Sequence, residues 1–266
     1  MNTIEEKKRV AEDFENAEVR AISFEEARPL ILQYEYLGTT GSAKIFYGLF
    51  FGPYLGCVVG FGSTAGTRVA ASVCGEDYAD KVIELVRGCR TLWAHKHSAT
   101  YLISRAAKDL AERGKNIIIA YSDPAGGERG VIYKAANFLP FGETGKSEKF
   151  VTPDGKVHDG RAVSGMTRDR RGGDLRYKRT RKQQKAILEA QGCRFEKGTK
   201  KRKWVLISGD RRIKRTLQKA FEMKHPKMKR QQALLNEIND DENKTPADGR
   251  HMAAGYQISP RPPRQP

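Results

Sequence analysis

Residues 117–144 carry the sequence IIIAYSDPAGGERGVIYKAANFLPFGET, which contains the strongest local signals in the chain. Three isoleucines and an alanine at residues 117–120 form a continuous apolar run, which predicts a strand buried on both of its faces. A proline and two glycines within residues 124–127 predict a turn directly after that strand. Apolar residues then recur at helix-like spacings over residues 131–138, which predicts a helix that carries Tyr133.

Polar residues follow the predicted strand at the point where it ends. Ligands in open α/β sheets bind outside the carboxyl ends of the strands, so Ser122 and Asp123 stand where a binding site is expected. Tyr133, on the helix that follows, is expected to share a pocket with Asp123. We take Asp123 and Tyr133 as candidate catalytic residues and Ser122 as a candidate substrate contact. The alternative is that Asp123 caps the turn and Tyr133 packs with its hydroxyl at the surface.

The segments before this unit predict strands and helices in alternation. Residues 17–22 alternate in hydropathy like a short strand. The sequence S-F-E-E that follows them is a capping box, which predicts a helix over residues 23–36. Two apolar runs at residues 44–51 and 54–62, joined by a Gly-Pro step, predict a β-hairpin.

Another strand is expected around residues 82–86, ending in Arg87, Gly88, Cys89 and Arg90. Ser98 is a good N-cap for a helix over residues 99–113, and Gly114 is expected to end that helix. The order of these elements predicts an α/β (α+β) fold, in which helices pack on a mixed central sheet.

The pattern weakens after residue 145 into a segment rich in Gly, Asp and Lys, which we interpret as a loop. Regular structure is predicted again as a helix over residues 178–190, a short basic strand over 203–207 and a basic helix over 210–221. Trp204, inside that strand, is expected to pack in the core and not to stack on a nucleobase.

Composition limits the class of protein. The chain has 266 residues, enough for one good-sized domain and an appendage, and 38% of them are hydrophobic. No apolar run approaches the length that spans a bilayer, and the charged start has no signal-peptide core. The four cysteines are scattered without zinc spacing and are expected to be reduced cytosolic thiols. We expect a cytoplasmic protein with no membrane partner.

Charge gives the strongest indication of a partner. The formal net charge is +17, and acids and bases are nearly balanced before residue 150. Basic clusters follow, which is typical of a polyanion binder, although the sign of the charge does not separate DNA from RNA. The alternative is a passive, solvated basic extension. The candidate nucleic-acid-binding residues are Arg170, Arg171, Lys178, Arg179, Lys201, Arg202, Lys203, Arg211 and Arg212.

Two resemblances to known families follow from these motifs. The element order, with IYKAANF on a helix after a strand, resembles the GNAT acetyltransferase fold. Several blocks resemble, more specifically, the phage Mom family of DNA-modification proteins. They are YLG at residues 36–38, VVGFG at 58–62, IELVR at 83–87, WAHKHSATYLISRAAK at 93–108, YSDPAGGERGVIYKAANF at 121–138 and KKRKWVLIS at 200–208.

Resemblance to the Mom family implies an enzyme that converts the N6 amine of adenine in double-stranded DNA to an N6-carbamoylmethyl group. In phage DNA this group gives protection from host restriction. The catalytic residues that the resemblance implies are Arg87, Asp123, Tyr133 and Ser98. The expected setting is therefore the cytoplasm of a phage-infected bacterial cell.

The first predicted loop departs from the family's pattern. In the Mom family a His often precedes the tyrosine of that loop, and iron has been proposed there. Here Glu35 precedes Tyr36, and one carboxylate without a nearby His is not a typical iron site. We therefore assign no metal ligand and take Glu35 and Tyr36 as candidate substrate-binding residues.

The stretch TLWAHKHSAT departs from the GNAT pattern, because it lacks the Gly-rich turn with which those enzymes bind the pyrophosphate of coenzyme A. Lys96 and the start of the predicted helix still provide a candidate anion site, so Lys96 joins the substrate-binding residues. The group donor stays open, and an acyl-coenzyme A and an activated amino acid are the classes considered.

These observations predict three parts of the chain. Residues 1–150 form a GNAT-like catalytic core, residues 151–238 a basic nucleic-acid-binding extension that completes the domain, and residues 239–266 a disordered polar tail. Two other functions stay open: a GNAT-family N-acyltransferase that uses acyl-coenzyme A on another amine, and a non-catalytic nucleic-acid-binding protein. The missing Gly-rich turn counts against the first, and the presence of Asp123 and Tyr133 counts against the second.

Overall fold

The structure, a computed structural model, describes residues 3–12, 14, 17–35, 37–124, 127–146, 148–160, 162–167, 180–226 and 228. The chain divides into two compact units, residues 1–225 and 226–266. The predicted disordered tail, residues 239–266, lies outside the described residues.

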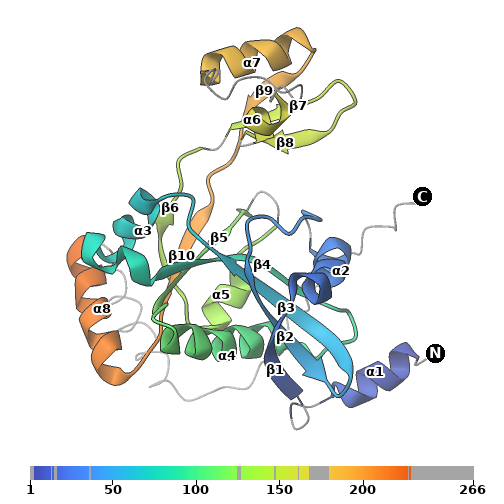
Figure 1. Cartoon of the computed structure of the whole chain (residues 1–266), viewed down its shortest axis with the longest axis vertical. Helices are drawn as coiled ribbons and strands as arrows, with labels where there is room; N and C mark the ends of the chain where they lie inside the picture. The colour runs from blue at the N-terminus through green and yellow to red at the C-terminus, as the bar shows by residue number, and fades with distance from the viewer. Residues whose placement is uncertain are drawn as a thin grey trace, which may run out of the picture. The chain divides into compact units, whose positions relative to one another are not determined.

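A seven-stranded mixed sheet forms the centre of the fold, in the order β1-β2-β3-β4-β5-β10-β6 (Figure 1). Neighbouring strands are antiparallel except β4 and β5, which are parallel. The predicted α/β fold with a mixed sheet is therefore confirmed. The strands are β1 (Ala17–Ile22), β2 (Ile45–Phe51), β3 (Tyr54–Gly62), β4 (Val82–Arg90), β5 (Ile117–Ser122), β6 (Leu139–Glu143) and β10 (Arg202–Ile207).

The helices cover both faces of this sheet (Figure 1). The core on one face contains residues of α4 (Ser98–Glu112) and the segment that follows α5 (Val131–Ala135). The other face is covered by α2 (Phe24–Tyr34), and by α3 (Thr67–Cys74) with α8 (Arg211–Lys224). Two further short helices, α1 (Ile4–Val10) and η1 (Glu76–Lys81), complete this part of the chain.

Strand β5 shows why its sequence is a continuous apolar run. Ile118 and Ala120 enter the core under α4, whereas Ile117 and Ile119 enter the core under α8. All four side chains are fully buried. Because successive side chains of a strand point to opposite faces, a strand covered on both sides must be apolar at every position.

The pairing between β4 and β5 is short. It covers only Val82↔Ile117, Ile83↔Ile118 and Glu84↔Ile119. Both strands continue beyond these pairs, β4 to Arg90 and β5 to Ser122. The strand expected here is confirmed as β4, which pairs with β3 as far as Arg90, so Arg87 lies inside it. The carboxyl ends of these two parallel strands are therefore not hydrogen-bonded to each other. A ligand is expected to bind at this point, outside the carboxyl ends of the strands.

Helix ends differ from the sequence prediction at two places. The predicted N-cap at Ser98 is wrong: His97 takes that position and Ser98 is the first helical residue. Its hydroxyl donates to the carbonyl oxygen of His95 at 2.6 Å. Helix α5 ends at Ala135, short of the predicted residue 138, because Asn137 adopts a left-handed conformation at φ 61°.

A second, three-stranded sheet in the order β8-β7-β9 has its own hydrophobic cluster. Its elements are β7 (Glu148–Val151), β8 (Val157–Asp159), α6 (Ala162–Met166), α7 (Arg181–Ala190) and β9 (Arg194–Lys197). Phe150 and Leu188 are buried in that cluster. Where we predicted a loop after residue 145, the structure therefore has a small folded unit, whose strands are too short for a clear alternation pattern.

Residues of the predicted basic extension also complete the central sheet. Strand β10 lies between β5 and β6, antiparallel to both. The predicted strand and helix in this region are confirmed as β10 and α8. In the part of the chain that the structure describes, no helix is long and apolar enough to cross a bilayer. The four cysteines are free and buried.

Gly130 provides a test of the packing that holds α5. It has φ +79°, and a Cβ there would lie 2.1 Å from Cζ2 of Trp204. We expect Gly130→Ala to lower the free energy of unfolding by about 3 kcal/mol or more, because left-handed strain adds to a clash with a buried ring. Urea unfolding measures this loss.

Gly127→Ala is the matched control. Gly127 has φ +86°, but a Cβ added there would meet nothing within 4 Å. It should therefore lose only the strain, roughly 1 kcal/mol. Equal losses in the two variants would show that Trp204 does not constrain the backbone at Gly130.

Candidate active site

Asp123 directly follows β5 and is held at both its backbone and its side chain. The residue is only 6% exposed. Its Oδ1 accepts a hydrogen bond from the hydroxyl of Thr199 at 3.0 Å. Its backbone N–H donates to Oε2 of Glu128 at 3.1 Å, and the N–H of Glu128 donates back to the carbonyl oxygen of Asp123 at 3.0 Å. The loop after β5 therefore closes on itself and presents two carboxylates together.

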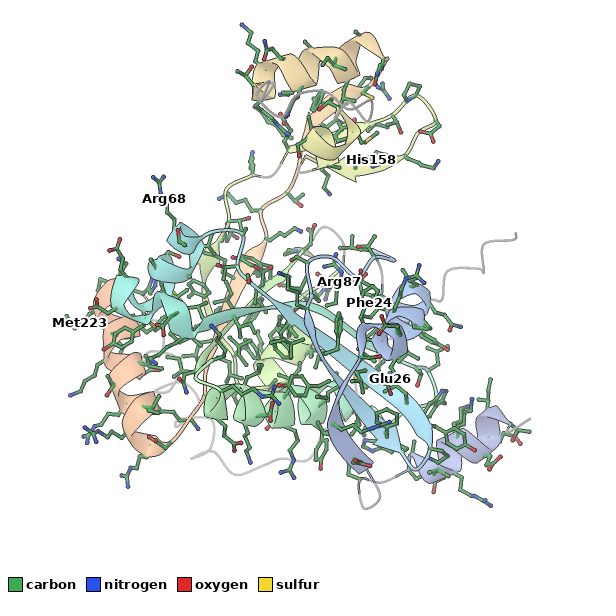
Figure 2. The ribbon with its side chains drawn as sticks, in the orientation of Figure 1. Phe24, Glu26, Arg68, Arg87, His158 and Met223 are labelled. Atoms are coloured by element: carbon green, nitrogen blue, oxygen red, sulfur yellow. The ribbon has the colours of Figure 1, made fainter. Side chains whose placement is uncertain are left out.

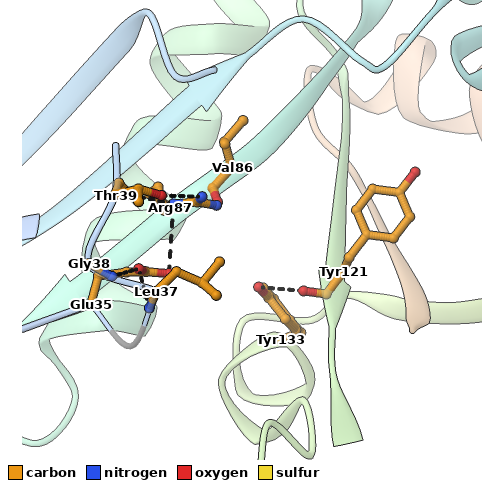
Figure 3. Close-up of polar contacts among 8 residues, drawn as sticks. All are labelled: Glu35, Leu37, Gly38, Thr39, Val86, Arg87, Tyr121 and Tyr133. Atoms are coloured by element: carbon orange, nitrogen blue, oxygen red, sulfur yellow. Dashed lines mark hydrogen bonds and ion pairs between the residues drawn. The ribbon is translucent and has the colours of Figure 1, made fainter. Parts of the chain in front are cut away.

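Tyr133 lies at the same end of β5. Its hydroxyl donates to the carbonyl oxygen of Tyr121 at 3.4 Å (Figure 3). Its ring packs between Phe138 and Trp204, with centroids 5.4 and 5.7 Å away. The structure thus brings Tyr133 and Asp123 to one strand end, as expected. Removing the hydroxyl leaves this ring packing intact.

Trp204 lies on β10 beneath this site and contacts both β5 and α5. It is 1% exposed and pairs in register with Ala120 of β5. Its Nε1 donates to the hydroxyl oxygen of Ser122 at 2.9 Å. The core position expected for Trp204 is therefore confirmed. Ser122 is fully buried with its hydroxyl bound to Trp204, so we interpret it as a structural residue, in place of the substrate contact predicted for it.

The loop after α2 carries Glu35, whose side chain is only 7% exposed. Its Oε2 accepts hydrogen bonds from the N–H groups of Leu37 at 2.7 Å and Gly38 at 3.1 Å. Its Oε1 lies 3.7 Å from Nε of Arg87 (Figure 3). Glu35, predicted to bind substrate, and Arg87, predicted to be catalytic, therefore form an ion pair with each other. Tyr36 lies outside the described residues.

Arg87, whose place in the fold is labelled in Figure 2, uses all three of its guanidinium nitrogens within the protein (Figure 3). Nε donates to the carbonyl oxygen of Thr39 at 2.6 Å, one terminal nitrogen to the Thr39 hydroxyl at 3.0 Å and the other to the carbonyl oxygen of Val86 at 2.7 Å. A Cβ on Gly41 would lie 2.9 Å from its Cζ. We therefore interpret Arg87 as a positioning residue that ties the loop to β4, and not as the group that contacts a donor.

The carboxylates of this region interact electrostatically. Burial raises the pKa of Glu35, and the charge of Arg87 opposes that rise. Burial also raises the pKa of Glu128; the N–H of Asp123 opposes the rise and the negative charge of Glu35 adds to it. Lys201 lowers the pKa of Glu128 and Asp123 raises it. The charge of Glu35 thus reaches Glu128, so the loop after α2 influences the carboxylate on the loop after β5.

Sequence reasoning missed Glu128 and Thr199. Glu128 stands in the GGERG turn, where a charged residue normally indicates only solvent exposure. Thr199 precedes β10, and its contact with Asp123 depends on where β10 enters the sheet.

Lys96 is exposed in the loop before α4, and Ser98 is fully buried. Among the described residues, no group of three or more His, Cys, Asp and Glu side chains is arranged to hold a metal ion.

The described candidate nucleic-acid-binding residues lie on β10, before it and on α8. Lys203 places its Nζ 4.9 Å from the centroid of the Phe141 ring. Helix α8 buries Leu217 and Phe221 against the sheet, while its other face is basic. The exposed cations of α8 include Arg211, Arg212, Lys214, Arg215 and Lys219. Four of the predicted residues, Arg170, Arg171, Lys178 and Arg179, lie outside the described part of the chain.

Comparison with known proteins gives one family match. The sequence profile of the Mom protein family matches residues 16–235. Among curated proteins, none matches the chain.

Several solved acetyltransferase structures are similar at low identity. A Bacillus subtilis acetyltransferase in complex with CoA is 10% identical with a TM-score of 0.38, covering 73% of this chain and 99% of that chain. An IAA acetyltransferase from Bacillus cereus is 11% identical with a TM-score of 0.41, covering 72% and 99%. An N-acetyltransferase from Staphylococcus aureus is 12% identical with a TM-score of 0.40, covering 72% and 98%. At these TM-scores the likeness carries no argument about activity.

The ion pair between Glu35 and Arg87 can be tested through stability. Arg87→Gln leaves a buried carboxylate without its cation, so we expect a loss of about 3 kcal/mol in the free energy of unfolding at pH 7. Without the Arg87 charge the pKa of Glu35 rises further. The loss should therefore shrink as the pH falls and Glu35 becomes protonated. Urea unfolding at several pH values measures both effects.

The double variant Glu35→Gln with Arg87→Gln is the control. It removes the buried negative charge, so it should recover much of the loss and its stability should depend less on pH than that of Arg87→Gln. Additive losses from the two substitutions would show that the pair does not interact.

Proposed function

We propose that this chain, which belongs to the Mom protein family, is a transferase that modifies the N6 amine of adenine in double-stranded DNA. The proposed product is an N6-carbamoylmethyl-type adduct, which in phage DNA would block restriction. Family membership over residues 16–235 supports a transferase of this kind. The observation that carries the proposal is the convergence of Asp123 and Tyr133 at the carboxyl end of β5.

The chemistry of adenine accounts for the residues at this site. The lone pair of N6 is delocalised into the ring, so the amine is a poor nucleophile. A carboxylate that accepts a hydrogen bond or a proton from N6 increases its nucleophilicity, and Asp123 is placed to supply one. Tyr133 supplies a hydroxyl that protonates the departing group. Arg87 and Glu35 act indirectly, since they hold the loop beside this strand end.

Access to N6 explains the basic surface. The amine lies inside the duplex, so the base must be flipped out, which costs a few kcal/mol of stacking and pairing. Contacts between cations and backbone phosphates offset that cost and position the strand. Helix α8 supports this part of the proposal, because its exposed face carries Arg211, Arg212 and Arg215.

Two classes of donor are consistent with transfer to an amine, an acyl-coenzyme A and an activated amino acid. Attack of N6 on the carbonyl carbon of either donor gives an N6-acyl product, whereas the N6-carbamoylmethyl product needs attack on a methylene carbon that carries the leaving group. The same pair of residues serves both reactions: a carboxylate at the attacking nitrogen and a hydroxyl at the leaving group.

Nucleoside mass spectrometry of DNA from cells that express the chain tests the proposal. We expect a new modified adenosine in cells with the wild-type chain. Asp123→Asn and Tyr133→Phe should each abolish it with little change in volume, because the first removes the negative charge that activates N6 and the second removes the hydroxyl that protonates the leaving group. Both variants should stay folded, since Asn keeps the oxygen that Thr199 contacts and Phe keeps the ring packing.

The outcomes separate function from packing. Unmodified DNA with normally expressed, folded wild-type protein would contradict the proposal. Near-normal modification by either variant would contradict the role of that residue. A variant that fails to fold would favour a structural role for it.

The basic face of α8 is tested by the salt dependence of DNA binding. We expect the triple variant Arg211→Gln, Arg212→Gln and Arg215→Gln to weaken binding to all DNA sequences alike. The slope of log affinity against log salt should fall by about three units, roughly one for each lost phosphate contact. Titration of a labelled duplex at several salt concentrations measures the slope.

Lys8, Arg9 and Arg28 serve as the matched control, because they are exposed cations on other helices. Their replacement by Gln changes the net charge equally but should leave the slope almost unchanged. If both triple variants change the slope to the same extent, α8 contributes only to overall charge and is not a phosphate-binding surface.

A further inference from the structure

Glu128 provides a second carboxylate at the candidate site, beside that of Asp123. It lies on the loop between β5 and α5 and is half-buried. Two hydrogen bonds to the backbone of Asp123 hold Glu128 in place. Oε2 of Glu128 accepts from the N–H of Asp123, and the N–H of Glu128 donates to the carbonyl oxygen of Asp123. Its carboxylate therefore stays next to the end of β5.

The two carboxylates differ in what their oxygens already bind. Oδ1 of Asp123 accepts the hydroxyl of Thr199, and the residue is only 6% exposed. Glu128 uses Oε2 for the N–H of Asp123, and in the described structure Oε1 has no hydrogen bond. No buried side-chain oxygen among the described residues lacks a partner, so Oε1 reaches solvent. An incoming amine can therefore approach Oε1.

The charges around Glu128 favour proton uptake. Two acidic side chains raise the pKa of Glu128 through their charge, Glu35 on the loop after α2 and Asp123 at the end of β5. Lys201, before β10, is the cation that interacts with it, while Arg87 is engaged by Glu35 and the Thr39 oxygens. Burial, the largest effect, raises the pKa of Glu128 above its ordinary value. A carboxylate with a raised pKa is a stronger base near neutral pH.

We infer that Glu128 is a further catalytic residue, whose Oε1 takes the proton that adenine N6 loses during transfer. This inference rests on the proposed function. N6 attacks the electrophilic carbon of an activated carbamoylmethyl donor with its lone pair, and a nitrogen–carbon bond forms. The bond from that carbon to the leaving group breaks, and the leaving group keeps the electron pair. One N6–H bond breaks, its electrons stay on nitrogen, and Glu128 becomes a neutral carboxylic acid.

The exocyclic amine carries two hydrogens, which matches the presence of two adjacent carboxylates. Asp123, held by Thr199 and by the loop backbone, orients the amine through one N–H group. Glu128, with its accessible oxygen, takes the proton of the other. The roles of hydrogen-bond acceptor and proton acceptor are thus divided between neighbours that are fixed to each other.

The test compares Glu128→Gln and Glu128→Asp with wild type and with Glu76→Gln, an exposed glutamate of η1. The rate at which modified adenosine accumulates after induction is measured by mass spectrometry, and unfolding of each purified protein is measured against pH. We expect Glu128→Gln to slow accumulation by about 100-fold or more, the usual contribution of a general base. Glu128→Asp should recover part of the rate, and Glu76→Gln should match wild type.

Stability should show the opposite trend. The folded state of the wild type binds a proton on Glu128 more tightly than the unfolded state does, so its stability decreases as pH rises through that raised pKa. Gln keeps the acceptor for the N–H of Asp123 but carries no charge. Glu128→Gln should therefore lose this decrease and be at least as stable as wild type at neutral pH.

Each outcome bears on a different claim. Modified adenosine in wild type together with a rate within about threefold in Glu128→Gln would overturn the role of Glu128 and leave the proposed function standing. A Glu128→Asp rate no higher than that of Glu128→Gln, with both folded, would overturn it in favour of a purely positioning role. No modified adenosine even in wild type would overturn the proposed function and, with it, the step assigned to Glu128.

Discussion

The packing of Trp204 under the end of β5 is the constraint on which the candidate site depends. The indole fills the core between the sheet and α5, and its only polar atom binds the hydroxyl of Ser122. Gly130 must lack a side chain to pass over this ring, so the backbone that leads into α5 is fixed by it. The position of Tyr133 follows, because its own ring packs on the same indole. A residue of β10 thus places a tyrosine that comes about 70 positions earlier in the chain.

The loop after α2 also contributes to the candidate site. An ion pair holds this loop in place, whereas the packing of Trp204 holds the segment that leads into α5. Glu35 and Arg87 are both largely buried. Glu35 accepts hydrogen bonds from backbone N–H groups of the loop, and Arg87 donates to the carbonyl and hydroxyl oxygens of Thr39 and to the carbonyl oxygen of Val86. Buried pairs of this kind add little net stability, but losing one member is costly. The pair therefore acts through geometry, because it fixes an otherwise irregular loop beside the ends of β4 and β5, where the two strands no longer pair with each other.

The clustering of Glu35, Asp123 and Glu128 works against folding stability. The negative charges of Glu35 and Asp123 both raise the pKa of Glu128. Protein interiors rarely retain such an arrangement without a functional reason, and perturbed carboxylates are concentrated at active sites. The basic face of α8 has a different relation to stability, because its cations are exposed and interact mainly with solvent. The two features suit the two halves of the proposed reaction, proton transfer at the base and phosphate binding along the strand.

The local sequence was sufficient for the elements whose signal is local. The run at residues 117–120, the capping box at Ser23 and the glycine after α4 each determine their own strand or helix, and all three are confirmed. Asp123 and Tyr133 could be chosen because both lie within one strand-turn-helix unit. The tertiary structure alone decided that β10 enters the sheet between β5 and β6, and with it the contacts of Thr199 and Trp204. Likewise, only the fold could show that Arg87 binds the loop after α2 and that the charge of Glu35 reaches Glu128, because these interactions join segments whose separation along the chain leaves no periodic signal in the sequence.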